Sequence, residues 1–453
     1  MDVEKKFDAS KFTKQWEKAR RKISVGACAA EIQCEPIVSL DPRIVGTKTG
    51  PLTGMMCAKE QLAEDCPDGD EKSDVSDVEN PDFLNDLPSS GDGGTLNWDR
   101  PIQETSGESV TLYDFKPGSG EHYGDPIADV YAVIARVNNA ILAIADGSDW
   151  GPKAREAARS AVRGSMECLN RKLFDSQYPL KTTRDVMNAI LQSFDSAHKC
   201  ILQTEGATSS SLCVAVVCEL VRPVRNKNWC VCVANLGDNA CFVWSNRKRI
   251  VQEVTYSASG NGCLGHAIGD KPDKSNLRCG FLPVHENDIV FLVTDGIFEN
   301  FDPVVLLDKA GAENRGNTEK GSGAAQQRAA LVTEERETAK LAKITELFLN
   351  ARSHKRVEHL SSGILVESLI EYAIDVTDQK RKFLERWWSD LDYINAEDRS
   401  SKEHEILKIA DDFPGKVDHA TAVAYEVGYL TDGQRHTGRK AFFSRANSLS
   451  NSH

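Results

Sequence analysis

The sequence lacks any long uninterrupted apolar run. Its first residues, MDVEKKFDASKFTKQW, contain no apolar core of the kind that a secretory signal needs. No later stretch approaches the length of a membrane-spanning helix. We therefore expect a protein without a membrane partner that resides in the cytoplasm, the nucleus or both.

The sequence is also poor in the features of nucleic-acid-binding and nucleotide-binding proteins. Its formal net charge is -13 over 453 residues, which argues against a nucleic-acid-binding surface as its main function. It has no Gly-rich loop followed by Lys and Ser or Thr, which a kinase or NTPase would use to hold phosphates. We expect no nucleic acid among its partners.

The 13 cysteines lack the spacing of a zinc site. Many lie inside apolar runs, where a free thiol behaves as a small buried apolar group. We expect reduced, buried thiols and no disulfides. Five cysteines carry this prediction: Cys213, Cys218, Cys230, Cys232 and Cys241.

Hydrophobic and charged contents of 40% and 27% are ordinary for a globular protein. Residues 1–105 are expected to be an acidic, largely disordered region, because 59–86 has too few large apolar residues to offset the entropy of ordering. Residues 430–453 read as a basic, Ser-rich disordered tail. A single large domain is expected between them, over 106–429.

Alternating apolar runs and helical periodicity predict the elements of this domain. Residues 130–137 and 140–145 indicate a hairpin through Asn138 and Asn139. Two helices should follow, the second opened by a capping pair of Thr182 and Asp185. The predicted helices and the later strands are 152–174, 182–201, 211–220, 229–235, 240–244 and 288–293.

The segment 303–405 reads as a long helical insertion. Its helices are predicted over 338–349 and 364–388, with a flexible Gly-rich and charged loop over 310–325. The pair Trp387 and Trp388 makes the insertion a candidate for binding a protein partner, although packing of these rings against the domain is the preferred interpretation.

Three apolar runs are bounded by an aspartate. They are 141–147 (ILAIADG), 291–296 (FLVTDG) and 417–423 (VDHATAV), and they carry Asp146, Asp295 and Asp418. A carboxylate is costly inside a buried strand but not at its exit. Mg²⁺ and Mn²⁺ prefer oxygen ligands, and carboxylates gathered from distant positions repel one another unless a cation lies between them. The pattern favours a hard-metal site.

These motifs and their order resemble the metal-dependent protein phosphatases, the type 2C Ser/Thr phosphatases of the PPM family, as a divergent member. The resemblance covers about 120–427. The matching segments are ADG from Ala145, GATSSSLCVAVV from Gly206, VCVANLGDNACFVW from Val231 (which resembles the family's "ANxGDSR" hairpin), LGHAIGD from Leu264, TDGIFEN from Thr294 and DHAT from Asp418.

The resemblance implies an α+β fold, a four-layer α-β-β-α sandwich with two antiparallel sheets. It also implies a Mg/Mn-dependent hydrolase that acts on phosphoserine and phosphothreonine of a phosphoprotein substrate. In the family, a hydroxide that bridges two divalent ions attacks the phosphorus.

The resemblance also implies roles for residues. Asp146 would bridge the two metal ions, Gly147 would offer its carbonyl to one of them, and Asp295 and Asp418 would complete one metal's ligands. These three aspartates are the predicted catalytic residues. The remaining ligand is Asp129 in DVYAV or, alternatively, Asp125 in GDP. The aspartates of LGDN and AIGD, Asp238 and Asp270, match acidic positions of looser role.

Several departures favour a second hypothesis. The family's Asp-Gly-His-Gly reads Asp-Gly-Ser-Asp here, so the expected general acid is absent. The phosphate-binding Arg expected before the first aspartate is replaced by Gly124 or Gly120, with Lys116 and His122 as weak substitutes. The alternative is therefore a metal-binding pseudophosphatase that acts as a regulatory protein-binding module.

Overall fold

The computed structural model describes residues 34–51, 100–116, 118–175, 177–255, 262–306, 323–391 and 396–430. The acidic segment 59–86 and the tail after Leu430 lie outside these ranges. The predicted loop 310–325 lies mostly outside them as well. Its last residues are helical, because a helix begins at Gly323 and continues with good helix formers.

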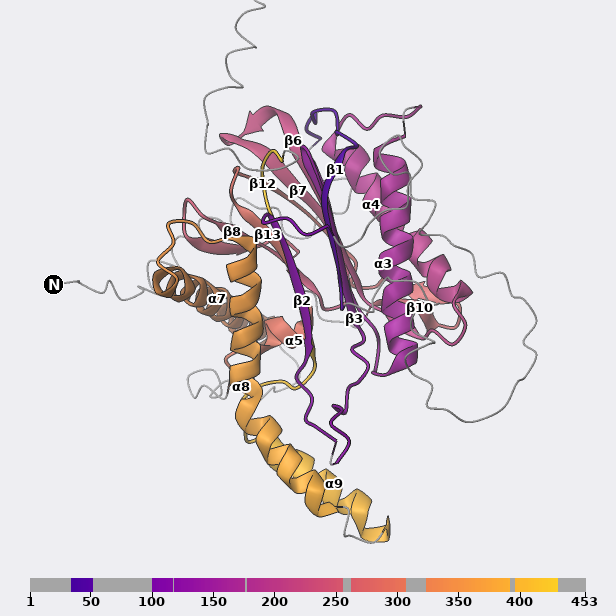
Figure 1. Ribbon diagram of the computed structural model, residues 1–453, viewed down its shortest axis with the longest axis vertical. Helices are drawn as coiled ribbons and strands as arrows, with labels where there is room; N and C mark the ends of the chain where they lie inside the picture. Colours follow the sequence, from indigo (N-terminus) through magenta and orange to yellow (C-terminus); the bar gives the residue numbers. More distant parts are fainter. Residues whose placement is uncertain are drawn as a thin grey trace, which may run out of the picture.

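A six-stranded sheet forms one half of the domain (Figure 1). All its neighbouring strands pair antiparallel. In spatial order the strands are β1 (Ile44–Gly50), β3 (Asp129–Arg136), β4 (Asn139–Asp146), β6 (Leu212–Val224), β7 (Lys227–Leu236) and β12 (Arg278–Val284).

A five-stranded antiparallel sheet faces it. Its strands, in spatial order, are β2 (Thr105–Thr111), β14 (His419–Glu426), β13 (Ile289–Val293), β8 (Ala240–Ser245) and β9 (Ile250–Glu253). A small third sheet contains β11 (Lys271–Asp273), β10 (Cys263–Ile268) and β5 (Ser209–Ser210).

Helices cover the outer faces of the two large sheets (Figure 1). The first pair, α3 (Pro152–Leu173) and α4 (Thr183–Gln203), lies on the six-stranded sheet. The other side carries α5 (Asp295–Phe298), the 3₁₀ turn η2 (Glu299–Phe301), α7 (Gly323–His354) and α8 (Ser362–Leu391), and α9 (Ala396–Ala410) packs against the end of α8.

Three apolar cores lie between the four layers. Along β3, Ile134 packs under α3 and α4, whereas its neighbour Val133 packs between the two sheets. On the other side, Phe291 of β13 packs against Phe348 of α7 and the core that includes Leu365 of α8. The four-layer α-β-β-α sandwich with two antiparallel sheets is therefore confirmed.

The predicted hairpin, the two predicted helices and the four predicted later strands are all present within a few residues. The five cysteines predicted to be buried thiols are buried and free. Thr182 and Asp185 form the predicted capping box at the start of α4.

Two expectations differ from the structure. The motif VCVANLGDNACFVW is not a hairpin, because β7 belongs to the six-stranded sheet and β8 to the five-stranded sheet. Gly237, whose φ of 100° favours glycine, lets the chain cross between them. Strand β1 also lies inside the region expected to be disordered, where it pairs with β3 at the edge of the sheet.

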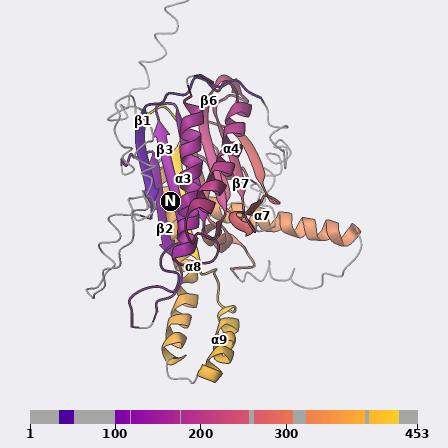
Figure 2. The same ribbon diagram turned by 90° about the vertical axis from the view of Figure 1, so that its right-hand side faces the viewer.

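Within the predicted insertion, α7 and the first half of α8 pack on the five-stranded sheet, whereas the end of α8 and α9 extend from the sandwich (Figure 2). Leu384 and Phe383 of α8 pack with Ile406 of α9 in a small separate core. Trp387 is half-buried against the same core, as the packing interpretation predicted, whereas the side chain of Trp388 lies outside the described part of the structure.

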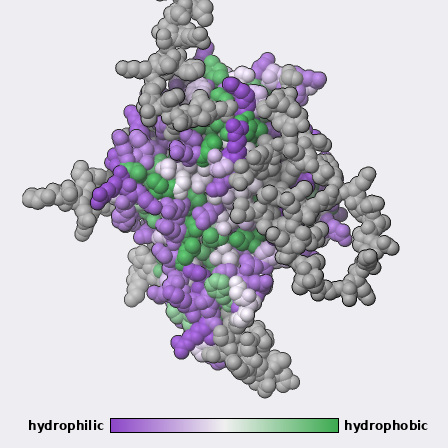
Figure 3. Space-filling model, in the orientation of Figure 1, coloured by the Kyte–Doolittle hydropathy of each residue, from purple (hydrophilic) through white to green (hydrophobic). Residues whose placement is uncertain are grey.

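The face shown in Figure 3 is mainly hydrophilic over its described surface, with smaller groups of hydrophobic residues between the polar ones. None of the described helices combines the length and the apolar character that crossing a membrane requires.

Candidate metal centre

Asp129 and Asp146 lie opposite each other in the β3–β4 ladder. Asp129 is fully buried, and its Oδ2 accepts a hydrogen bond of 2.8 Å from the hydroxyl of Thr294, the residue after β13. Its other oxygen, Oδ1, is buried and accepts no hydrogen bond. Burial raises the pKa of Asp129, although His419 and the Thr294 hydroxyl oppose this.

The main chain of Asp146 is held in place by two serines. Its N–H donates to Ser211 Oγ at 3.1 Å, and its carbonyl accepts from the Ser211 N–H and the Ser210 hydroxyl. The side chain is thereby left to face the space between the sheets. Burial raises the pKa of Asp146, and the nearby carboxylates of Asp129 and Asp295 raise it further.

Gly147 follows where the chain passes under the first turn of α3. A Cβ at this position would lie 2.1 Å from the carbonyl oxygen of Ala154, so no side chain fits without displacing the helix. Gly147 also donates its N–H to the carbonyl of Ala128 at 3.3 Å. The glycine therefore lets Asp146 lie at the start of the helix.

Asp295 begins α5, directly after β13. It is 7% exposed, and its Oδ1 is buried without a hydrogen-bond partner. Burial raises the pKa of Asp295 to about 8, with a further contribution from Asp418 that Lys416 opposes. A buried carboxyl oxygen without a hydrogen-bond partner is costly, and a cation bound to it would offset that cost.

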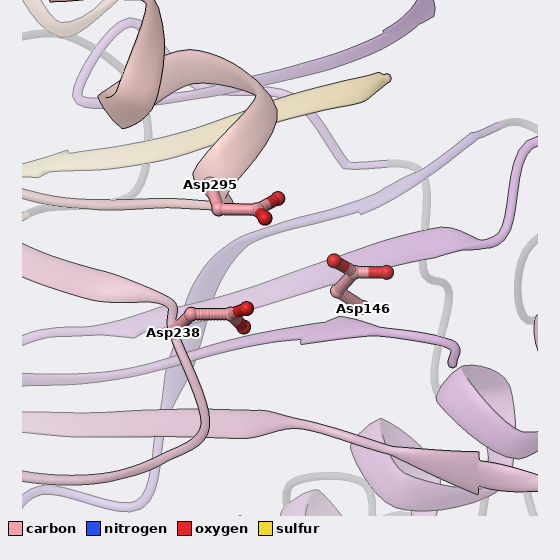
Figure 4. Close-up of side chains that lie close together, drawn as sticks. All are labelled: Asp146, Asp238 and Asp295. Carbon is pink, nitrogen blue, oxygen red and sulfur yellow. The ribbon is translucent and has the colours of Figure 1, made fainter. Parts of the chain in front are cut away.

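Asp146, Asp238 and Asp295 converge from three segments of the chain (Figure 4). One carboxyl oxygen from each lies within 4.8 Å of the others. Asp238 is exposed and lies in the turn where the chain crosses from β7 to β8. The three carboxylates, with the unpartnered oxygen of Asp295, fit a hard divalent cation.

Asp418 lies beside these three aspartates, and both Asp418 and Asp295 form ion pairs with the ammonium of Lys416. The Lys416 ammonium is ion-paired with Asp295 Oδ2, with Asp418 Oδ2 at 3.0 Å and with Glu299 Oε2 at 3.2 Å. Burial alone would lower the pKa of Lys416, but these carboxylates outweigh burial and raise it. Lys416 is therefore a cation within the acidic cluster.

Asn300 holds the main chain of Lys416. This fully buried residue accepts the Lys416 N–H at 2.8 Å and donates to the Lys416 carbonyl at 3.0 Å. It also donates to the carbonyl of Gly296 in α5 at 2.7 Å. The segment before β14 is thus tied to the helix that carries Asp295.

Asp418 is bound by neighbours on its other side. Its Oδ1 accepts from the Tyr113 hydroxyl at 3.2 Å, and its carbonyl accepts from the Leu112 N–H. Burial raises the pKa of Tyr113, and the charge of Asp418 raises it further.

His419, in the DHAT motif, fixes the loop that leads into β3. Its Nδ1 accepts from the Ala128 N–H at 3.3 Å, which leaves the proton on Nε2 to donate to the Gly124 carbonyl at 2.8 Å. Asp125 lies in this loop, where its Oδ2 accepts from the His122 N–H at 2.7 Å. Of the two alternatives for the first ligand, Asp129 is the one opposite Asp146.

The position expected for the phosphate-binding Arg is filled by other side chains. A Cβ on Gly124 would lie 2.2 Å from the Tyr113 ring and 2.8 Å from His419 Nε2. The suggested substitutes are engaged elsewhere: Lys116 pairs with Glu121 at 3.2 Å, and His122 stacks on Phe115.

The two acidic positions to which the resemblance gave a looser role differ in their location. Asp238 joins the cluster, whereas Asp270 is 80% exposed and pairs with His266. Sequence reasoning missed Lys416, Glu299 and Asn300. The available signal was their position, because Glu299 and Asn300 end the TDGIFEN motif and Lys416 lies two residues before Asp418.

Known proteins resemble part of this chain. Residues 119–331 match the family model described as protein phosphatase 2C. A PP2C-like domain-containing protein of Drosophila melanogaster is 39% identical over 224 residues, which make up 47% of this chain and 31% of that protein. The chain thus spans about a third of the length of this curated relative. The predicted resemblance to the PPM phosphatases is confirmed.

Solved structures with a similar chain course include the photosystem II phosphatase PBCP, at 14% identity and a TM-score of 0.38, covering 72% of this chain and 99% of that chain. The PPM Ser-Thr phosphatase MsPP from Mycobacterium smegmatis is 12% identical with a TM-score of 0.33, covering 72% and 98%.

Proposed function

We propose that this protein is a Mg²⁺- or Mn²⁺-dependent protein phosphatase that hydrolyses phosphoserine and phosphothreonine. The observation that supports this most strongly is the convergence of Asp146, Asp238 and Asp295, with a buried oxygen of Asp295 that has no partner. Such a set is expensive to maintain in a fold that binds no cation.

In this proposal the carboxylates act as a group. Asp146 and Asp295 hold the ions, Asp129 and Asp418 support them from either side, and the Gly147 carbonyl is a further candidate ligand. Bound Mg²⁺ or Mn²⁺ would supply an activated water and neutralise the phosphoryl charge. The chain's own task is to hold the carboxylates in place, and the Ser210 and Ser211 contacts fix the main chain of Asp146.

A second function is favoured by a specific observation. The Tyr113 ring and His419 occupy the space beside Gly124, so no side chain there can clamp a phosphate. A metal-binding pseudophosphatase that binds a regulatory partner, with the insertion 303–405 as the candidate surface, would not need the clamp.

Hydrolysis of a phosphopeptide with and without Mn²⁺ tests the two functions. The enzyme requires turnover that depends on Mn²⁺ and that falls about 100-fold or more in Asp146→Asn and Asp295→Asn. Asp270→Asn is the matched control, because this exposed carboxylate lies outside the cluster. Mn²⁺ binding by calorimetry without turnover would favour the pseudophosphatase.

A further inference from the structure

Among the described residues, Lys416 is the basic side chain that forms ion pairs with Asp295 and Asp418 of the candidate metal centre. Its ammonium contacts Asp295, Glu299 and Asp418 together. Three carboxylates around one small cation reproduce the surroundings that a divalent ion would have. The ammonium therefore already occupies the space between Asp295 and Asp418.

The position of Lys416 is built into the fold. Asn300 binds its main chain through both the N–H and the carbonyl, and Asn300 is itself fully buried. The short segment between Lys416 and Asp418 leads directly into β14, whose first residue, His419, is anchored to Gly124. The lysine is thus directed into the cluster by a rigid frame.

The carboxylates on the other side lack such a partner. Asp146 and Asp238 form no ion pair among the contacts recorded for the described residues, and Asp295 Oδ1 has no hydrogen bond. One divalent ion can bind to these oxygens while Lys416 stays in place. A second ion that uses Asp418 must displace the ammonium.

We infer that Lys416 is a tethered cation that takes the place of one divalent ion, so that the native site binds a single ion through Asp146, Asp238 and Asp295. This inference rests on the proposed metal site and deepens it. The lysine would determine both the number of ions bound and their affinity.

Calorimetry with Mn²⁺ and metal analysis of the loaded protein test the inference. We expect about one Mn²⁺ per chain for the native protein. Lys416→Met removes the charge and keeps the length of the side chain, so we expect two Mn²⁺ per chain, with the first bound about tenfold more tightly. Lys355→Met is the matched control, because it removes an exposed lysine paired with Glu367.

The outcomes separate this inference from the proposed function. Equal ion numbers and affinities in the native protein and Lys416→Met, with binding lost in Asp146→Asn, would overturn the inference alone. Absence of Mn²⁺ binding in both proteins would overturn the metal site and the inference with it. Binding by Lys416→Met alone would overturn both the single native ion that the inference requires and the metal-dependent native enzyme.

Folding of the variant is checked by circular dichroism, and the native protein provides a second test that needs no variant. Electron paramagnetic resonance of the Mn²⁺-saturated native chain should show the spectrum of an isolated Mn²⁺ ion. The spectrum of a spin-coupled pair would overturn the inference.

Discussion

Asp129 stands directly across the β3–β4 ladder from Asp146, so the two strands bring two carboxylates together where the hairpin opens. Directly opposed like charges destabilise a strand pair. Burial raises the pKa of both carboxyls, which agrees with a site that is strained until a cation binds.

Replacing Asp129 by Asn should raise the stability of the ion-free protein and weaken its stabilisation by metal. The amide removes one buried charge and can donate to Asp146, so the ion-free protein should gain about 1–2 kcal/mol. The rise in melting temperature on adding Mn²⁺ should shrink, because the negative charge near the ion is reduced. Both quantities are measured by thermal unfolding with and without Mn²⁺.

Asp270→Asn serves as the control for this prediction, since the exposed carboxylate pairs only with His266 among the recorded ion pairs of the described residues. It should change neither melting temperature. An Asp129→Asn protein that melts lower without Mn²⁺, or that keeps the whole Mn²⁺ response, would contradict the role of Asp129.

Gly296 should tolerate no side chain. A Cβ at this position would lie 1.9 Å from the carbonyl oxygen of His419, so Gly296→Ala must displace either α5 or the start of β14. We expect a loss of about 1–3 kcal/mol in the free energy of unfolding, measured by urea denaturation.

Gly363→Ala is the matched control, because it also adds one methyl group at a glycine. Its nearest heavy atom would be Ser361 Oγ at 4.0 Å, and the position lies in the first turn of α8. We expect this variant to be unchanged or more stable by about 0.5–1 kcal/mol. Equal losses in the two variants would show that close packing does not cause the effect.

Asp302 should make the stability of the domain depend on pH under acidic conditions. This buried carboxylate binds Arg336 at 2.5 Å and Lys340 at 3.2 Å, and so docks α7 next to α5. Burial would raise the pKa of Asp302, but the Arg336 hydrogen bond and the Lys340 charge outweigh burial and hold it below 3.8.

A lowered pKa means that the folded protein favours the ionised form. The stabilisation is complete above the ordinary pKa and is lost as the pH falls through the lowered value. Asp302→Asn should therefore cost about 1–3 kcal/mol near pH 7 and progressively less below pH 4. Urea denaturation at several pH values measures the difference, which a constant gap down to pH 2.5 would contradict.

Local features were predictable from the sequence, and contacts between distant segments were less so. The capping box of Thr182 and Asp185 depends on adjacent residues, and Asp146 and Asp295 follow apolar strands, so both patterns are visible in the chain. Strand β1 has few large apolar residues and gains its place by pairing with β3, which no local pattern reveals.

In the candidate metal centre, too, local features were easier to predict than contacts between distant segments. Asp238 is less visible than Asp146 because it lies in a crossing between the two sheets, and its approach to the cluster depends on how the sheets pack. Lys416 could be seen as a neighbour of Asp418, but its pairing with Asp295 and Glu299 depends on side-chain geometry that only the fold supplies.

The packing around Gly124 offers a further prediction about why a phosphate clamp is absent. Because an added Cβ would meet the Tyr113 ring at 2.2 Å, Gly124→Ala should cost about 1–3 kcal/mol. Tyr113→Ala removes that ring together with its hydrogen bond to Asp418, and has a cost of its own. The double variant should lose less stability than the sum of the losses in the two single variants, because removing the ring relieves the clash. A double-mutant cycle by urea denaturation measures this coupling. Strict additivity would mean that the ring does not exclude a side chain at Gly124, and the packing would then no longer explain why the chain lacks an arginine there.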